Sequence, residues 1–306
     1  MQSKKYSVCC DIGGSHISCL LINTYTGIIT DSSSIHVKVA HSSSSDTLLE
    51  TWTQAIKKCK SFAPRDAEFV GVSMAIPGPF DYKNGIGLYD NSNQKFVHLF
   101  QVNIKEALAD RLDIAPADIR FINDATAFAL GAFWYGSGKE YSKIVAITLG
   151  TGFGSSFISN GVAIEQGTTV PKEGCLWHVP FKEGIADDYF STRWFVTNYN
   201  EVSSEKVSGV RRLAELASNG NKEAIALFDE FGKNLADCLE QPLKVFHAEA
   251  VIMGGNISEA FHLFKPSLTK RLAEKELNIV FKVSILKENA AMLGAVTTFK
   301  TLTNEK

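Results

Sequence analysis

The chain has 306 residues, which is about the length of two domains and too long for one small core. Hydrophobic residues make up 45% of it and charged residues 21%, the usual balance of a soluble globular protein. The formal net charge of −2 gives no electrostatic reason to expect nucleic acid or an acidic membrane surface as a partner. No apolar run approaches the roughly 18 residues that span a bilayer, and none near the N-terminus is long enough for a signal peptide, so we expect a cytoplasmic protein.

The first half of the chain alternates strand and helix signals. Residues 6–10 and 17–22 are rich in β-forming residues and flank a glycine turn, which predicts a hairpin. The pattern Thr47-x-x-Glu50 has the form of a capping box, and the apolar residues after it recur at helical spacing. Further signals predict a strand at 69–75, a helix at 103–112, and a strand at 120–123 that leads into a helix near Ala125.

The second half repeats the opening pattern. Strands are predicted at 144–148 and 155–159 around a glycine turn, followed by a long helix at 228–246 that Pro242 interrupts or ends. A buried strand at 250–253 and a closing helix at 289–299 complete the chain. Strands that alternate with helices indicate an α/β fold, and the hairpins make its sheets mixed. We place one lobe at 1–117 with 288–306, and the other at 118–287.

Three glycine turns follow strands and carry hydroxyl or amide side chains. Glycine admits positive φ and lets backbone N–H groups approach an anion closely, so such turns can bind phosphate. One turn alone is weak evidence, because most are only turns, but three in one chain favour a nucleotide site. No G-x-G-x-x-G fingerprint joins a strand to a helix, and the P-loop pattern is missing. The predicted nucleotide-binding residues are Gly13, Gly14, Ser15, Gly150, Thr151, Gly152, Gly254, Gly255 and Asn256, with Asp11 beside the first turn.

Two acidic residues at strand ends are candidates for chemistry. Asp11 could contact Mg²⁺ through water, or could hydrogen-bond its own turn. Asp124 follows Asn123 at a junction of strand and helix, where open α/β folds place ligand groups. Capping the helix is the commoner role of such an aspartate, although a cap leaves one carboxylate oxygen for catalysis.

Six segments, in order over nearly the whole chain, resemble the motifs of the bacterial ROK family of sugar kinases and repressors. They are D-I-G-G-S (11–15), P-G-P-F-D (77–81), N-D-A-T-A-F-A-L-G (123–131), L-G-T-G-F-G (149–154), V-I-M-G-G-N-I-S (251–258) and A-A-M-L-G-A-V (290–296).

The resemblance implies a two-lobed actin-like ATPase fold of the ribonuclease H-like kind, with mixed sheets and a cleft between the lobes. It implies ATP and Mg²⁺ as cofactors, with Asp11 on the metal side, and Asp124 as the base near the accepting hydroxyl. Gly78 and Asn123 would contact the sugar. Family members are commonly dimers or larger, so a homodimer is expected.

The sugar side departs from the family's usual pattern. G-C-L-W-H at 174–178 stands where G-E-x-G-H is usual, so His178 is kept while Cys175 replaces the glutamate. Asp187 replaces the glutamate that usually closes the following cysteine-rich zinc segment. The zinc cysteines are missing, and the six cysteines of the chain contain no C-x-x-C pair, so we predict no structural zinc. By resemblance, His178 and Asp187 are the sugar contacts; read without the family, His178 is more often structural.

The leading hypothesis is an ATP-dependent kinase of a hexose or hexosamine, similar to glucokinase. The retained Asp11, Asn123 and Asp124 favour it, because a pure binding protein has no need of a base. The alternative is a non-catalytic, ROK-like sugar-binding or regulatory protein, which the altered 174–178 stretch favours. A nucleotide phosphatase on the same scaffold would hydrolyse ATP without sugar. No nucleic-acid or membrane partner is expected.

Overall fold

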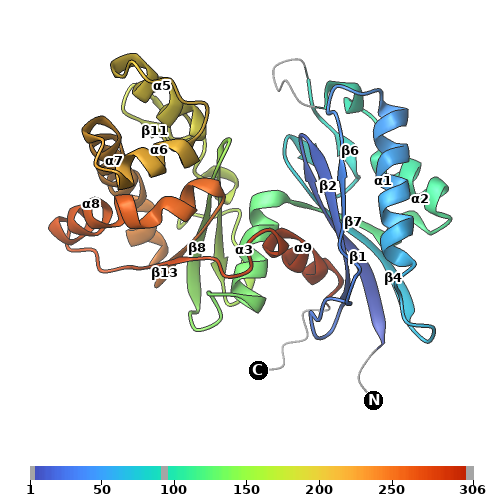
Figure 1. Ribbon diagram of the computed structural model, residues 1–306. Coiled ribbons are helices and arrows are strands. Elements are labelled where there is room, and N and C mark those ends of the chain that lie inside the picture. The colour runs from blue at the N-terminus through green and yellow to red at the C-terminus, as the bar shows by residue number, and fades with distance from the viewer. Residues whose placement is uncertain (1–3, 91–95, 301–306) are drawn as a thin grey trace. The chain divides into compact units, whose positions relative to one another are not determined.

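The computed structural model describes residues 4–90 and 96–300. These residues form two compact units (Figure 1). The first comprises the described residues of Met1–Gly131 and Glu288–Lys306, and the second comprises Ala132–Lys287. Among the described helices, none is long and apolar enough to cross a membrane.

The first unit is built on a mixed five-stranded sheet with the order β3-β2-β1-β4-β7. Strand β1 pairs antiparallel with β2 and parallel with β4, and β4 pairs parallel with β7. The expected first hairpin and the mixed character of the sheet are therefore present. The strands are β1 (Lys5–Gly13), β2 (His16–Asn23), β3 (Ile35–Lys38), β4 (Glu68–Ile76) and β7 (Ile119–Asn123), with a separate short pair, β5 (Phe80–Asp81) and β6 (Ile86–Gly87).

Helices cover both faces of this sheet. Figure 1 shows α1 and α2 on one face and α9 on the other. Helix α1 buries a stripe that includes Trp52, which is fully buried, because its apolar residues recur at helical spacing. The helices of the unit are α1 (Ser45–Lys60), α2 (Ile104–Leu112), α9 (Asn289–Ala295) and the start of α3 (Asp124–Tyr135), with short 3-10 turns η1 (Val97–Leu99), η2 (Pro116–Asp118) and η5 (Val296–Phe299).

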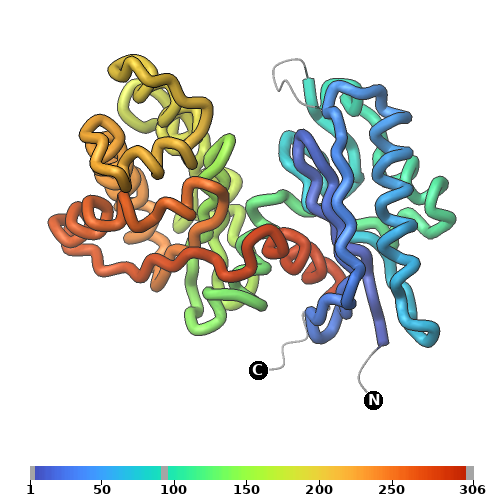
Figure 2. Tube along the Cα trace, viewed as in Figure 1, coloured from blue at the N-terminus to red at the C-terminus, as the bar shows by residue number. Residues whose placement is uncertain are grey.

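Two glycines allow α3 and α9 to pack closely within the first unit. A Cβ on Gly131 would lie 1.9 Å from the carbonyl oxygen of Ala290, and one on Gly294 would lie 1.7 Å from that of Ala127. Real Cβ atoms do not approach that closely, so both positions need glycine. Figure 2 follows the C-terminal segment back to β1, as expected for a closing helix that packs on the first lobe.

The second unit has a mixed five-stranded sheet with the order β10-β9-β8-β13-β14. Strand β8 pairs antiparallel with β9 and parallel with β13, which pairs parallel with β14. Its strands are β8 (Lys143–Leu149), β9 (Phe153–Ser159), β10 (Val162–Ala163), β13 (Ala250–Gly254) and β14 (Val280–Val283), with a separate pair, β11 (Pro180–Phe181) and β12 (Gly184–Ile185).

Helices and an aromatic cluster fill the core of the second unit. The ring of Phe231 lies 4.7 Å from that of Phe195 and 5.1 Å from that of Phe264, centroid to centroid. Such tilted and edge-on pairs stabilise a core beyond the area they bury. The helical elements are α4 (Ala186–Tyr189), α5 (Thr192–Val202), α6 (Val210–Ser218), α7 (Lys222–Phe246) and α8 (Phe261–Glu274), with η3 (Lys172–Gly174) and η4 (Asn256–Ala260).

Several boundaries differ from the sequence prediction. The N-cap of α1 is Ser44, whose Oγ accepts from the N–H of Thr47 at 3.3 Å, so the cap lies one turn before the predicted capping box. Helix α7 starts at Lys222, earlier than expected, and continues through Pro242. Packing against the core stabilises the last turns of α7, since Leu243 and Phe246 are both buried.

The boundary between the units also lies later than the predicted residue 118. Strand β7 pairs with β4 through the register of Val72 with Ile119, so residues 119–123 belong to the first sheet. The chain leaves the first unit within α3, after Gly131. A boundary at 118 would remove an edge strand from a sheet that it completes.

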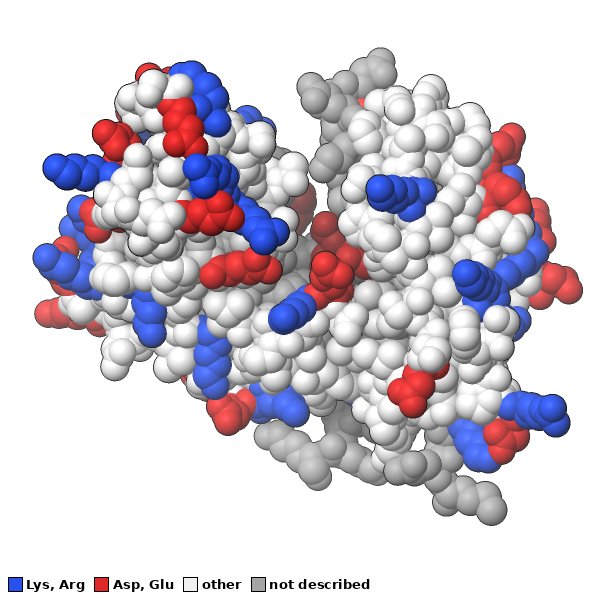
Figure 3. Space-filling view, viewed as in Figure 1, with Lys and Arg blue, Asp and Glu red and all other residues white. Residues whose placement is uncertain are grey.

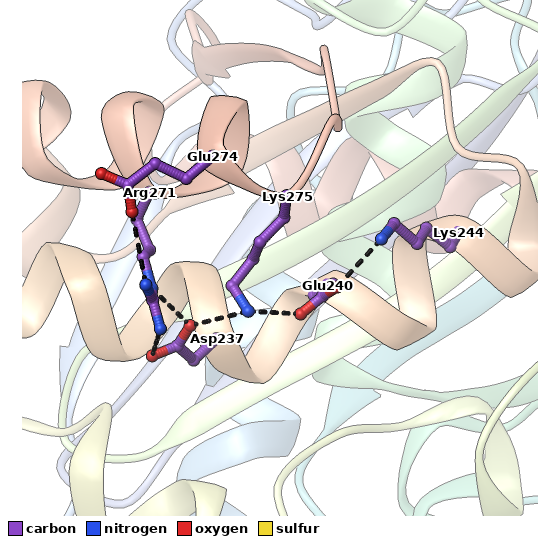
Figure 4. Close-up of polar contacts among 6 residues, drawn as sticks. All are labelled: Asp237, Glu240, Lys244, Arg271, Glu274 and Lys275. Carbon is purple, nitrogen blue, oxygen red and sulfur yellow. Dashed lines mark hydrogen bonds and ion pairs between the residues drawn. The ribbon is translucent and has the colours of Figure 1, made fainter.

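An ion-pair network joins α7 to α8 in the second unit (Figure 4). Lys275 on the α8 side lies 2.5 Å from a carboxylate oxygen of Glu240 and 3.1 Å from one of Asp237, both on α7. The side chains of Lys275 and Glu240 are each only 20% exposed, so solvent screens this pair less than a fully exposed one. The other members are Lys244, Arg271 and Glu274.

Replacing Lys275 with glutamine should lower the free energy of unfolding at low salt and lower it by less at high salt. Lys275, and then Lys244, hold the pKa of Glu240 below its ordinary value through hydrogen bonds. The stabilisation is therefore present above a glutamate's unfolded pKa of about 4.3 and is lost as the pH falls through the lower folded value.

Urea unfolding at pH 7 and under acid conditions measures this effect. Arg211→Gln is the matched control, because Arg211 is 95% exposed in its pair with Glu215. Equal effects of the two substitutions at pH 7 would contradict a stabilising network.

Candidate functional site

The first unit places Asp11 on β1 just before the first glycine turn. Strand β1 ends at Gly13 and β2 starts at His16, so the turn itself is Gly14-Ser15. A Cβ on Gly13 would lie 2.7 Å from Cε1 of His16, so the imidazole packs directly over that glycine. His16 follows the turn motif immediately and was not among the residues predicted for this site.

Asn123, and not Asp124, caps helix α3. The Oδ1 atom of Asn123 accepts from the backbone N–H groups of Ala125 at 3.0 Å and Thr126 at 3.1 Å. Asp124 is the first helical residue, and its own Oδ1 accepts from the Ala125 N–H at 2.9 Å. The alternative in which Asp124 is the cap is therefore wrong, because its neighbour satisfies the first free donors of the helix.

Asp11 and Asp124 belong to one acidic group in the first unit. Burial above all, and then the nearby charges of Asp124 and Glu288, raise the pKa of Asp11 to about 7. Two carboxylates that repel each other in this way suit a divalent cation, which prefers oxygen ligands. The part of the chain that the structure describes contains no group of three or more His, Cys, Asp or Glu residues able to hold a metal ion. A Mg²⁺ ion that arrives with a nucleotide needs only one or two protein carboxylates, so the residues fit it.

Replacing Asp11 with asparagine should stabilise the ligand-free protein at pH 8 and leave its stability unchanged at pH 4. The folded state binds a proton at Asp11 between pH 3.8 and about 7 that the unfolded state has lost, so the wild type loses stability as the pH rises through this range. The gain at pH 8 should be about 1–4 kcal/mol.

Thermal unfolding at both pH values, without nucleotide or Mg²⁺, checks the Asp11 prediction. Asp110→Asn is the control, because Asp110 is exposed on α2. A variant of Asp11 that is less stable than the wild type at pH 8 would contradict the acidic group.

The predicted sugar-side turn lies between β4 and β5 in the same unit. Gly78 has room around it, since its nearest neighbour outside the turn, Oη of Tyr82, would lie 3.4 Å from an added Cβ. The hydroxyl of Tyr89 donates to the carbonyl oxygen of Pro77 at 2.7 Å and holds the start of the turn. The Nδ2 atom of Asn123 donates to Oη of Tyr82 at 3.1 Å. The structure thus brings Gly78, Asn123 and Asp124 to one end of the sheet.

In the second unit, the turn Gly150–Gly152 joins β8 to β9. Phe153 and Gly154, which were assigned to the turn from the sequence, are the first residues of β9. The carbonyl oxygen of Gly150 accepts from both the N–H and the hydroxyl of Thr192, at 2.7 and 2.9 Å. A side chain and a backbone group therefore fix this turn from outside.

Asp187 holds the other end of the same turn. Its Oδ1 accepts from the N–H of Phe153 at 2.7 Å, and its Oδ2 lies 3.5 Å from a guanidinium nitrogen of Arg193. A Cβ on Gly152 would lie 3.0 Å from Oδ1, so glycine leaves the space that the carboxylate uses. The sugar contact predicted for Asp187 stays a prediction, whereas its contact with the turn is a feature of the structure.

The turn after β13 lies beside the turn after β8. The two strands are parallel neighbours, with Thr148 opposite Gly254, so their ends meet at the same edge of the sheet. Gly255 has φ +82, and a Cβ there would lie 2.3 Å from the carbonyl oxygen of Leu149. Asn256 begins η4 directly after it. Two of the three predicted glycine turns therefore adjoin within the second unit.

The altered stretch at 174–178 packs against β9. Leu176 is fully buried, and its N–H donates to Oγ of Ser155 at 2.7 Å. Trp177 is 47% exposed, and its ring lies 5.1 Å from that of His178. Burial raises the pKa of Cys175 to about 11, so its thiol is neutral at pH 7, where a glutamate would be charged. The Sγ atom of Cys175 lies 3.6 Å from Nδ1 of His178.

Several contacts at these sites were not predicted from the sequence. Tyr82 directly follows the P-G-P-F-D turn, and Glu288 directly precedes the closing helix, so proximity to a motif was the available signal for both. Thr192 and Ser155 carried no such signal, because a hydroxyl that binds a distant backbone group leaves no pattern in the sequence.

The chain belongs to the ROK family, whose pattern it matches over residues 7–301. It is 27% identical to a glucokinase of Thermotoga maritima, with 95% of this chain and 96% of that protein covered. It is 25% identical to an N-acetyl-D-glucosamine kinase of Yersinia enterocolitica, with 69% and 77% covered. Its fold is similar to the crystal structure of a glucokinase from Parabacteroides distasonis, with a TM-score of 0.79, 21% identity, and 97% and 98% covered. The fold is therefore the two-lobed actin-like ATPase fold of ROK sugar kinases, as the sequence motifs predict.

Proposed function

We propose that this protein is an ATP-dependent kinase that phosphorylates a hydroxyl group of a hexose or hexosamine. Membership of the ROK family and the relatives named glucokinase and N-acetyl-D-glucosamine kinase support the coarser statement, a sugar kinase. The observation that carries the proposal is the end of β7, where Asn123 caps α3 and Asp124 belongs to an acidic group with Asp11.

In this proposal Asp124 accepts the proton of the attacking hydroxyl, and Asn123 donates a hydrogen bond to the sugar. Phosphoryl transfer passes through a loose transition state, so positioning and neutralisation of charge matter more than strong proton abstraction. Asp11 would hold Mg²⁺ through water, and that ion would neutralise charge on the phosphate oxygens. Backbone N–H groups of the three glycine turns would bind the nucleotide phosphates.

The geometry of the second unit supports one of its two proposed sugar contacts over the other. Both carboxylate oxygens of Asp187 already have protein partners, so we assign it first to the Gly150–Gly152 turn. His178 is then the better candidate for contact with the sugar. From the family resemblance alone we also expect a homodimer. From the sequence itself we expect a cytoplasmic protein and, because the zinc cysteines usual in the family are missing, no structural zinc.

A specific observation favours a second candidate, a non-catalytic sugar-binding or regulatory protein. The neutral thiol of Cys175 stands where the family usually has a carboxylate, and it cannot replace the hydrogen bonds of a charged acceptor. An enzyme with an unusual sugar preference would show the same feature.

Release of ADP across a panel of hexoses, hexosamines and N-acetylhexosamines, with ATP and with or without Mg²⁺, separates the two. The kinase predicts turnover that needs both one of these sugars and Mg²⁺. Nucleotide binding without turnover on any sugar supports the binding protein, and ATP hydrolysis that ignores sugar indicates a phosphatase. On the face drawn in Figure 3, acidic and basic side chains are interspersed, so the charge on this face gives no reason to expect a polyanionic partner.

A further inference from the structure

Tyr82 links two strand ends of the first sheet through its hydroxyl group. Its Oη accepts from Nδ2 of Asn123 at 3.1 Å and donates to the carbonyl oxygen of Ile76 at 3.3 Å. Ile76 is the last residue of β4, and it is the register partner of Asn123, the last residue of β7. A directed chain of hydrogen bonds therefore runs from Asn123 through Tyr82 to β4.

The amide of Asn123 can adopt only one orientation in this arrangement. Its Oδ1 is taken by two backbone N–H groups at the start of α3, so Oδ1 cannot face a ligand. Its Nδ2 carries two hydrogens, one of which goes to Tyr82. The remaining hydrogen makes Asn123 a donor toward anything bound beside Asp124, which as a carboxylate is an acceptor.

We propose that Tyr82 is a positioning residue that fixes the side-chain amide of Asn123 as a hydrogen-bond donor for the sugar. This role of Tyr82 rests on the proposed function, because it defines which groups of the sugar the site recognises. A substrate must present an acceptor oxygen to Asn123 and a hydroxyl proton to Asp124. A sugar with adjacent hydroxyl groups meets both requirements, and a deoxy sugar that lacks the acceptor oxygen does not.

The turn that carries Tyr82 is itself held in place. The rings of Phe80 and Tyr82 lie 5.3 Å apart, and Phe80 is buried against Phe121 at 5.0 Å. Loss of the Tyr82 hydroxyl alone should therefore leave the ring and the turn where they are. Tyr82→Phe is the corresponding single-atom change.

Tyr82→Phe should raise the KM for the sugar about threefold to tenfold, the effect of one lost neutral hydrogen bond, with the KM for ATP unchanged. The background variant Asn123→Ser keeps an oxygen that caps α3 but has no amide donor. In that background Tyr82→Phe should have less than about a twofold further effect. Tyr199→Phe is the control, since the hydroxyl of Tyr199 is buried with no hydrogen-bond partner among the described residues.

An equal loss in both backgrounds would overturn the proposal, because it would mean that Tyr82 contacts the sugar itself. An unchanged KM in Tyr82→Phe would overturn the proposal as well. The proposed function would still stand, provided that the wild type phosphorylates a sugar. If the wild type phosphorylates no sugar, the proposed function fails. NMR then tests separately whether Tyr82 positions the amide of Asn123. The side-chain NH₂ signals of Asn123, assigned by their loss in Asn123→Ser, should shift in Tyr82→Phe, and unshifted signals would overturn it.

Discussion

Replacing Asp124 with asparagine should lower kcat for sugar phosphorylation by about 10²–10⁴-fold, the usual contribution of a general base. Asparagine has nearly the same shape and can keep the first turn of α3, but it cannot accept the hydroxyl proton. The cap of the helix is unaffected, since Asn123 supplies it. The KM for ATP should change little, because the glycine turns remain.

Two further measurements make the Asp124 prediction specific. The charge of Asp124 helps to raise the pKa of Asp11 to about 7, so that pKa should fall in the variant. Asp110→Asn, on the exposed face of α2, is the matched control and should retain full activity. Normal turnover of the Asp124 variant would remove the catalytic assignment.

Gly150→Ala should weaken nucleotide binding by about tenfold or more without lowering the melting temperature, because the methyl group would stand where a phosphate approaches the backbone of the turn. Leaving aside its two chain neighbours, no heavy atom of the described residues lies within 4 Å of a Cβ at this position, and Gly150 does not have the positive φ that disfavours alanine. The folded protein therefore has no need of glycine here. A phosphate group held by the backbone of the turn would need that space.

Substitutions at two other glycines serve as controls for this prediction. A Cβ at Gly209 also meets no atom within 4 Å in the described part of the chain beyond its two neighbours, so Gly209→Ala should change neither stability nor binding. Gly255→Ala should lower the melting temperature, because φ is +82 and the methyl would meet Leu149. Isothermal titration with ADP and thermal unfolding measure both effects. Unchanged ADP affinity in Gly150→Ala would show that phosphate does not approach this turn.

The alternation of strands and helices was predictable because apolar periodicity records which face of an element is buried. The hairpins around the first two glycine turns, the strand that ends at Asn123 and the closing helix are all present. Ends of elements were predicted less well. Pro242 lies inside α7 because packing of its neighbours outweighs the lost hydrogen bond, and no local signal reports such packing.

The residues of the candidate site were predicted from motifs, whereas their contacts were not predicted. The pair Asn123-Asp124 was recognised, but only the structure shows that Asn123 is the cap. Asp187 was assigned to the sugar because of its place in a motif. Its hydrogen bond to Phe153, which lies 34 positions away in the sequence, depends on the fold. A sequence pattern shows residue types at fixed spacing, whereas a side-chain contact between two loops depends on the three-dimensional fold.

A crystal structure with a non-hydrolysable ATP analogue, Mg²⁺ and the preferred sugar would show whether Asp124 faces the accepting hydroxyl. We expect a carboxylate oxygen of Asp124 within about 2.6–3.2 Å of the sugar hydroxyl that faces the terminal phosphate. We also expect the three glycine turns to contact the nucleotide. A sugar hydroxyl that faces another base, with Asp124 turned away from the substrate, would contradict the role proposed for Asp124.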